Sequence, residues 1–281
     1  MIKYLSLFSG IGAFESAMRN LNIPFEMIGY CEIADEPAKA YSLMQNIPES
    51  KNFGDITKID ETKLEKVDFI TYGFPCQDIS WAGKQQGFKD EEGHKTRSGL
   101  FFDAARIIKA TQPKVAIAEN VKPLTGAKFK NEFNIVLKTL EEAGYNNYWK
   151  ILKASDFNVP QDRERVFIVS IRKDVDTKIF EFPKEIPLNR FMKDYVENEV
   201  DKKYFLTPTQ ISKIFKWKAQ QRPFKRILGL NSVSPTLTAR GAGEYHSGMI
   251  LFSKEFQETK NCDNEEAIKT LHCRVLTERE F

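Results

Sequence analysis

The sequence predicts an α/β protein built on a doubly wound, mostly parallel sheet, with a small irregular lobe attached. Three observations carry this prediction. Up to about residue 171, short apolar runs bounded by turn residues alternate with amphipathic stretches, the pattern of repeated strand–helix–strand units. After that point this rhythm is lost, and Pro183, Pro187, Pro208 and Pro223 interrupt a stretch rich in lysine and aromatic residues. From residue 234 a more regular pattern returns and continues to residue 281.

Strands and helices alternate in the first part of the chain. The expected strands are Lys3–Phe8, Phe25–Cys31, Phe69–Tyr72, Val115–Glu119 and Val166–Ile171. The expected helices are Phe14–Leu21, Pro37–Met44, Leu100–Thr111 and Asn131–Ala143. A doubly wound sheet binds its ligands at the carboxyl ends of its strands, so we expect the functional motifs at that edge.

Composition indicates an ordinary globular protein, with 41% hydrophobic and 29% charged residues in a chain of 281. The N-terminal stretch MIKYLSLFSGIGAF is too short to span a membrane and has no signal-peptide cleavage pattern, so we expect a cytoplasmic protein without a membrane partner. The four cysteines show no paired spacing, which argues against a disulfide framework or a zinc site. We therefore expect no metal.

A glycine turn follows the first expected strand, as Ser9-Gly10-Ile11-Gly12, and leads into a helix. Glycines let the backbone approach a ligand closely, and a helix N-terminus offers unsatisfied N–H groups. Glu32 follows the second strand, where a carboxylate could accept hydrogen bonds from ribose hydroxyls. Glu15 stands where the dinucleotide fingerprint has its third glycine, so these residues alone leave NAD, adenosylmethionine or no ligand equally open. Asp55 could bind an adenine amino group or simply end a turn.

Cys76 is the candidate nucleophile, in the segment Gly73-Phe74-Pro75-Cys76-Gln77 at the end of a strand. A lone cysteine is more often a small buried apolar residue than a nucleophile. Here, however, a proline fixes the chain direction before it, and a polar loop with three glycines follows from Gln77 to about Thr96. Such a loop suits a lid that closes over a substrate.

Two further groups of charged residues lie next to expected strands. Glu119 ends an apolar strand, where a carboxylate could cap a neighbouring helix or hold a proton for donation. Arg163 and Arg165, two positions apart in Gln161-Asp162-Arg163-Glu164-Arg165, would share a face in extended chain. Alternatively they form part of a surface strand of alternating ion pairs.

Taken in order, FSGIG, CE, GDI, GFPCQ, SGLFFD, ENV, QDRERVF and SPTLTARG resemble the successive motifs of the cytosine-C5 DNA methyltransferase family, of the restriction-modification or phage type. The resemblance spans nearly the whole chain. It implies an adenosylmethionine-dependent methyltransferase fold with a catalytic and cofactor-binding domain at 1–171, a target-recognition lobe at 172–232 and a return segment at 233–281.

The resemblance also implies a mechanism and a cofactor, S-adenosyl-L-methionine. The Cys76 thiolate adds to C6 of a flipped-out cytosine, Glu119 supplies a proton or hydrogen bond to N3, and Arg165 with Arg163 binds O2 and the nearby backbone. The implied cofactor contacts are Phe8, Gly10, Ile11, Gly12, Glu32, Ile33, Asp55, Ile56, Pro75 and Leu100. The implied DNA contacts are Gln77, Ser80, Lys213, Lys216, Lys218, Thr236, Thr238 and Arg240.

The stretch from Lys202 to Arg226 holds eight basic residues and no acidic one, interleaved with aromatic residues. Such a run is usually a solvated face. Because it falls in the region that the resemblance assigns to target recognition, we expect part of it to contact the phosphates of double-stranded DNA.

The sequence departs from the family pattern at one point, since no Gly-Asn pair of the family's final motif occurs in it. We therefore expect the missing motif to come from a second polypeptide, or the chain to be an inactive fragment or a subunit of a split enzyme. A tRNA cytosine-C5 methyltransferase is a further alternative, because a close branch of the family uses the same catalytic residues.

Overall fold

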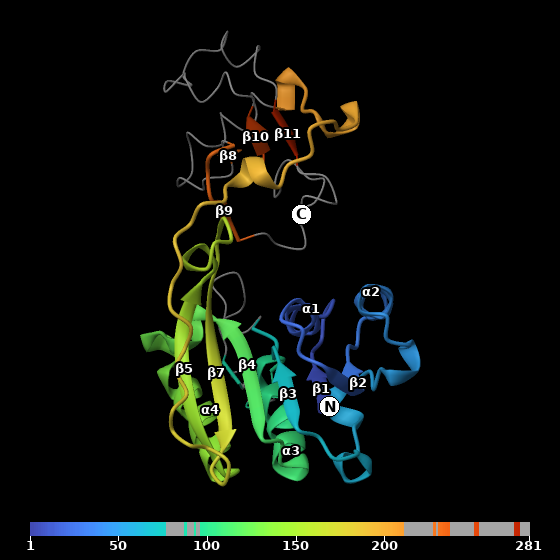
Figure 1. The fold of residues 1–281 in the computed structure, drawn as a ribbon, viewed down its shortest axis with the longest axis vertical. Coiled ribbons are helices and arrows are strands. Elements are labelled where there is room, and N and C mark those ends of the chain that lie inside the picture. Colours follow the sequence, from blue (N-terminus) through green and yellow to red (C-terminus); the bar gives the residue numbers. More distant parts are fainter. Residues whose placement is uncertain are drawn as a thin grey trace. The chain divides into compact units, whose positions relative to one another are not determined.

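The computed structural model describes residues 1–76, 87–88, 93, 96–210, 227–228, 230–236, 250–252 and 273–275. Its contacts divide the chain into two compact units (Figure 1). The first unit comprises Met1–Leu152 and Glu164–Phe182, and the second comprises Lys153–Arg163 and Pro183–Phe281. The functional division that we expect at residues 171 and 232 stays a prediction.

A six-stranded sheet forms the centre of the first unit, with the strand order β2-β1-β3-β4-β7-β5 (Figure 1). Its strands are β1 (Ile2–Leu7), β2 (Phe25–Cys31), β3 (Phe69–Tyr72), β4 (Val115–Val121), β5 (Tyr145–Lys153) and β7 (Glu164–Arg172). Strand β1 pairs in parallel with β2 and β3, and β3 pairs in parallel with β4, whereas β7 runs antiparallel to β4. The predicted doubly wound, mostly parallel sheet is thus confirmed.

Helices cover both faces of this sheet because successive residues of a strand point to opposite sides. The α-helices are α1 (Ala13–Asn20), α2 (Asp35–Gln45), α3 (Phe101–Thr111) and α4 (Lys130–Glu142). On one face the Tyr4 hydroxyl donates to Glu15 of α1, which also accepts from Tyr41 of α2. On the other face Leu5 and Leu7 join the main core, to which α3 and α4 contribute.

Short 3₁₀ turns occur in both units. They are η1 (Glu49–Lys51), η2 (Ile56–Lys58), η3 (Glu61–Lys63), η4 (Ser98–Leu100), η5 (Lys122–Thr125), η6 (Ala127–Phe129), η7 (Ala154–Asp156), η8 (Met192–Asp194) and η9 (Lys202–Tyr204). The expected strands and helices are all present; β2 and β3 have the expected bounds, and the ends of the others differ by at most two residues. Strand β5 was not expected, because Asn146 and Asn147 near its start are poor strand formers and Trp149 and Lys150 are both exposed.

The carboxyl ends of β1, β3 and β4 lie next to one another at one edge of the sheet. Leu7, the last residue of β1, pairs with Cys31 on one side and with Tyr72 on the other. Tyr72 in turn pairs with Ala118 of β4. Because β7 is antiparallel to β4, its first residues reach the same edge, where Arg165 pairs with Val121. Strands β2 and β3 lie on opposite sides of β1, so the direction in which the sheet is built reverses at β1. Doubly wound sheets bind ligands at such a switch point.

The second unit contains short strands, which are β6 (Gln161–Asp162), β8 (Ile227–Leu228), β9 (Ser234–Pro235), β10 (Ile250–Phe252) and β11 (Cys273–Val275). Strand β6 pairs in parallel with β9, and β10 lies between β11 and β8. The pairing of β6 with β9 joins the start of the QDRERVF motif to the start of the SPTLTARG motif, two segments far apart in the sequence.

Candidate active site

The glycine turn after β1 is fixed by hydrogen bonds to its own backbone and to β2. The Ser9 amide donates to the Cys31 carbonyl at 3.0 Å, and the Ser9 hydroxyl contacts the carbonyls of Ser6 and Cys31. Gly12, at φ 87°, occupies the N-cap position of α1 in the left-handed conformation. The turn therefore delivers the N-terminus of α1 to the ligand-binding edge of the sheet.

Glu32, at the end of β2, is hydrogen-bonded to this turn. Its Oε2 accepts from the Gly10 amide at 3.0 Å, and its Oε1 accepts from the Ala34 amide at 2.9 Å. The structure thus brings together the glycine turn and Glu32, the two groups that we expect in one cofactor site. Ile11 and Ile33 lie beside them with side chains 51% and 73% exposed, so apolar surface is available there for a ligand to cover.

Asp55 caps the 3₁₀ turn η2. Its Oδ1 accepts from the amide of Thr57 at 3.0 Å and from the Thr57 hydroxyl at 2.8 Å. The hydrogen bond from the Thr57 backbone amide is the main reason that the pKa of Asp55 lies below its usual value. The neighbouring Ile56 is buried in the core, so its backbone is the part that can face a ligand.

The segment that carries Cys76 is held in place by a hydrogen bond from the Asn120 side-chain amide and by aromatic packing of Phe74. Asn120 of β4 is 2% exposed, and its Nδ2 donates to the Phe74 carbonyl at 3.0 Å. The Phe74 ring lies 5.4 Å from that of Phe101 at the start of α3. Pro75 and Cys76 follow directly, and the Cys76 thiol is half-buried and in no disulfide. Leu100, also half-buried, packs against the same core.

Glu119 and Arg165 form an ion pair at the same edge of the sheet. The Arg165 Nε donates to Oε1 of Glu119 at 3.0 Å, and the two side chains are only 18% and 25% exposed. A Cβ atom built on Gly73 would lie 3.7 Å from Oε2 of Glu119. This is an ordinary van der Waals distance, so the GFPCQ segment begins within contact range of the carboxylate.

The remaining predicted residues divide between the second unit and the part of the chain outside the described residues. Arg163 belongs to the second unit, where its carbonyl accepts from the Ala154 amide. In that unit the Thr236 hydroxyl donates to the Asp162 carbonyl at 2.9 Å. The residues outside the described ranges are Gln77, Ser80, Lys213, Lys216, Lys218, Thr238 and Arg240.

Comparison with known proteins identifies the family. The model of the C-5 cytosine-specific DNA methylase family matches residues 2–281. The chain belongs to this family. Its relatives include an orphan methyltransferase, M.SPRI, of Bacillus phage SPR, which is 35% identical over 88% of this chain and 62% of its own length. The type II methyltransferase M2.ScrFI of Lactococcus lactis subsp. cremoris is 36% identical over 75% of this chain and 72% of its own length.

The chain spans about three fifths of the length of the first curated relatives that it matches. Solved structures share its fold. The Entamoeba histolytica methyltransferase EhMeth has a TM-score of 0.78 at 20% identity, over 100% of this chain and 84% of its own. The Dnmt2 methyltransferase of S. pombe has a TM-score of 0.73 at 22% identity, over 100% and 85%.

The described residues add two observations on cofactors and membranes. No group of three or more His, Cys, Asp or Glu side chains among them is arranged to hold a metal ion. None of the helices in the described ranges is long and apolar enough to cross a membrane.

Sequence reasoning did not single out Asn120 as a site residue, although it is the middle residue of the ENV motif. A polar residue expected next to a buried strand end was the available signal. Gln45, which contacts the glycine turn, lies in none of the motifs.

Proposed function

We propose that this chain methylates C5 of a cytosine in double-stranded DNA through a covalent bond between Cys76 and C6 of the base. The observation that carries the proposal is the order of groups along one sheet edge. The glycine turn follows β1, and the Cys76 segment follows β3. Glu119 lies near the end of β4, and Arg165 lies near the start of β7.

The residues around the glycine turn fit S-adenosylmethionine. The N-terminus of α1 offers amide groups to a carboxylate or hydroxyl, and Glu32 offers oxygen acceptors for ribose hydroxyls. Each carboxylate oxygen accepts more than one hydrogen bond, so the Gly10 and Ala34 amides do not exhaust Glu32. When bound, the cofactor supplies an electrophilic methyl group for C5.

The cytosine ring needs activation because its C5 is a poor nucleophile. The Cys76 thiolate adds to C6, forming the S–C6 bond and moving the π electrons of the C5–C6 bond into the ring. Glu119 supplies a proton or a hydrogen bond at N3, which stabilises the added electron density. C5 then carries the nucleophilic electron pair. After methylation, the C5 proton passes to solvent, any proton on N3 returns to Glu119, and the C5–C6 double bond forms again as the Cys76 thiolate is expelled.

Arg165 has two roles in this proposal. Its Nε holds the carboxylate of Glu119 in one orientation. A guanidinium has five N–H donors, and Nη1 donates to the Glu164 carbonyl at 2.8 Å, so in this proposal the same group turns a further donor toward the cytosine O2. Arg163 would bind O2 or the backbone beside it.

The target base must leave the duplex because the thiol cannot reach C6 in a stacked helix. Gln77 and Ser80, which follow Cys76 in the sequence, would contact DNA, and the basic run of the recognition lobe would bind phosphates. Thr236, Thr238 and Arg240 would position the DNA backbone. The comparisons give no support to a second polypeptide, and we do not propose one.

A trapping experiment tests this function. An oligonucleotide duplex with 5-fluorocytosine at the target should form a stable adduct in the presence of S-adenosylmethionine, because fluorine cannot leave C5 as a proton does. Peptide mass spectrometry should find the adduct on Cys76, and Cys76→Ser should give neither adduct nor methylation. An adduct on another residue, or normal turnover by Cys76→Ser, would refute the mechanism. Methylation of tRNA but not DNA, measured side by side, would favour the RNA alternative.

A further inference from the structure

Gln45, the last residue of α2, reaches the glycine turn from a distant part of the sequence. Its Nε2 lies 3.0 Å from the carbonyl oxygen of Ile11 and 3.0 Å from that of Gly12. The same nitrogen donates to the hydroxyl of Ser16 in the first turns of α1. The Gln45 side chain is only 1% exposed, so these bonds are made without competition from water.

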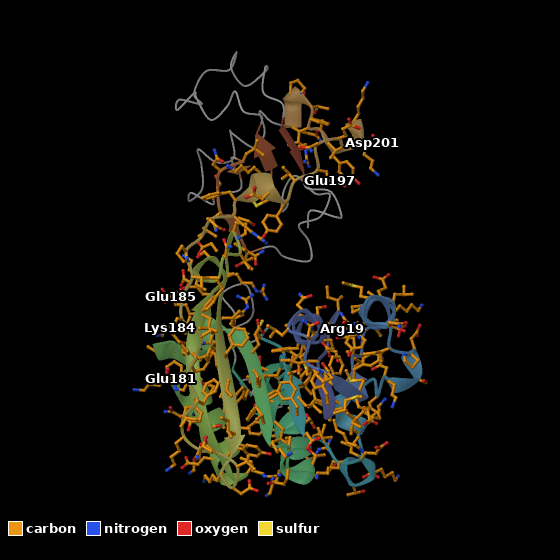
Figure 2. All side chains as sticks on the ribbon, in the orientation of Figure 1. Arg19, Glu181, Lys184, Glu185, Glu197 and Asp201 are labelled. Carbon is orange, nitrogen blue, oxygen red and sulfur yellow. The ribbon has the colours of Figure 1, made fainter. Side chains whose placement is uncertain are left out.

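Arg19 of α1 sets the orientation of the Gln45 amide. Its Nη1 donates to Oε1 of Gln45 at 2.8 Å, and its Nη2 donates to the Gln45 backbone carbonyl. Figure 2 labels Arg19. Because the guanidinium only donates, the amide must turn its oxygen toward Arg19 and its NH₂ group toward the turn. A glutamate at this position would instead direct an anionic oxygen at two carbonyls.

The turn and Gln45 are also in close contact. A Cβ atom built on Gly12 would lie 2.6 Å from Cγ of Gln45. Only glycine therefore fits at this position, and the turn packs directly against the Gln45 side chain. The opposite end of α2 is tied to the turn as well, because Glu32 accepts from both Ala34 and Gly10.

We propose that Gln45, oriented by Arg19, is a positioning residue for the cofactor. By holding the carbonyls of Ile11 and Gly12, it keeps the turn in the conformation that presents the N-terminus of α1 to the ligand. Gln45 touches no reacting atom, so it should affect cofactor affinity rather than the chemical step. This inference rests on the proposed function, because it takes the turn to be the S-adenosylmethionine site.

Gln45→Met tests the inference, since methionine keeps the length of the side chain and removes its donors. The Kd for S-adenosylmethionine, measured by calorimetry without DNA, should rise about tenfold, because the Ile11 carbonyl loses the Gln45 donor and the Gly12 carbonyl keeps only its bonds from the amide and hydroxyl of Ser16. The kcat at saturating cofactor should stay within about twofold of the original value. A role confined to overall stability would not separate Kd from kcat in this way.

Gln112→Met is the matched control. Gln112 also donates through Nε2 to two backbone carbonyls, those of Lys109 and Ala143, but it lies just before β4, at the other end of the strands. This variant should lose stability and keep its cofactor affinity. Arg19→Met is a second test on an exposed residue, and it should raise the Kd about threefold by freeing the Gln45 amide.

The outcomes separate this inference from the function on which it rests. If the unaltered chain binds S-adenosylmethionine and Gln45→Met binds it equally well, the positioning role is wrong and the proposed function stands. If Gln45→Met and Gln112→Met weaken binding equally, the effect is one of stability and the inference is again wrong. If the unaltered chain does not bind S-adenosylmethionine, the proposed function fails and the inference fails with it.

Discussion

Asn120 should couple the end of β4 to the position of the nucleophile, and replacing it by leucine tests this. Leucine has the same number and branching of side-chain heavy atoms as asparagine but cannot donate to the Phe74 carbonyl, which lies 3.0 Å from Nδ2 in a site where Asn120 is 2% exposed. A buried carbonyl that loses its donor costs about 1–3 kcal/mol. We expect the free energy of unfolding to fall by about that amount.

The catalytic effect should be larger than this loss of stability suggests. Phe74 lies two residues before Cys76, so a change at its carbonyl moves the thiol directly. A displacement of about 1 Å at a reacting group can lower a rate by about a hundredfold. We expect kcat for DNA methylation to fall between about tenfold and a hundredfold, with the Kd for S-adenosylmethionine changed less than about threefold.

Asn147→Leu provides the control for this experiment. Asn147 lies on β5, where its Nδ2 donates to the Leu137 carbonyl at the same distance of 3.0 Å. Chemical denaturation and methylation kinetics should be measured on both variants. We expect a similar loss of stability in both and a loss of kcat in Asn120→Leu alone. Equal kcat values for the two variants would refute the coupling of Asn120 to Cys76.

Four further predictions concern Glu119, the Cys31 thiol and the DNA contacts. Glu119→Gln should lower the methylation rate about a hundredfold or more while S-adenosylmethionine affinity is retained; collapse of cofactor binding in a calorimetric titration would instead make Glu119 structural. Burial raises the pKa of the Cys31 thiol from 9.0 to about 12, so its thiolate fraction at pH 8.5 is about a thousandfold below that of an ordinary cysteine. Iodoacetamide should therefore modify Cys76 well before Cys31, and site-resolved mass spectrometry that finds equal rates would contradict this. The pKa of Cys31 is higher in the folded chain than in the unfolded chain, so the stability that this thiol contributes is present below about pH 9 and is lost as the pH rises toward 12. Cys31→Ala should reduce that loss of stability, measured by alkaline denaturation. Neutralising three lysines of the basic run, Lys213, Lys216 and Lys218, should weaken binding to all DNA sequences. It should also reduce the slope of log K against log salt by up to about three, and an unchanged slope would mean that the run does not contact phosphates.

The sequence by itself determined the fold class and the family. Apolar runs with turn residues between them identify strands without reference to distant residues, because the hydrophobic pattern and the turn chemistry are local. The motifs at the ends of those runs, with Cys76 and Glu119 among them, are likewise contiguous. The resemblance to cytosine-C5 DNA methyltransferases could therefore be drawn from short segments in order, and the family match over residues 2–281 confirms it.

The tertiary structure decided which of these segments meet. Arg165 reaches Glu119 only because β7 runs antiparallel to β4, which brings the start of one strand to the end of the other. No local pattern specifies that pairing, since strand direction depends on how the chain returns across the sheet. Asn120 and Gln45 gain their partners in the same way, since Asn120 contacts Phe74 and Gln45 contacts Gly12, both more than thirty residues distant in the sequence. Such contacts depend on the packing of whole elements, and that packing exists only in the folded chain.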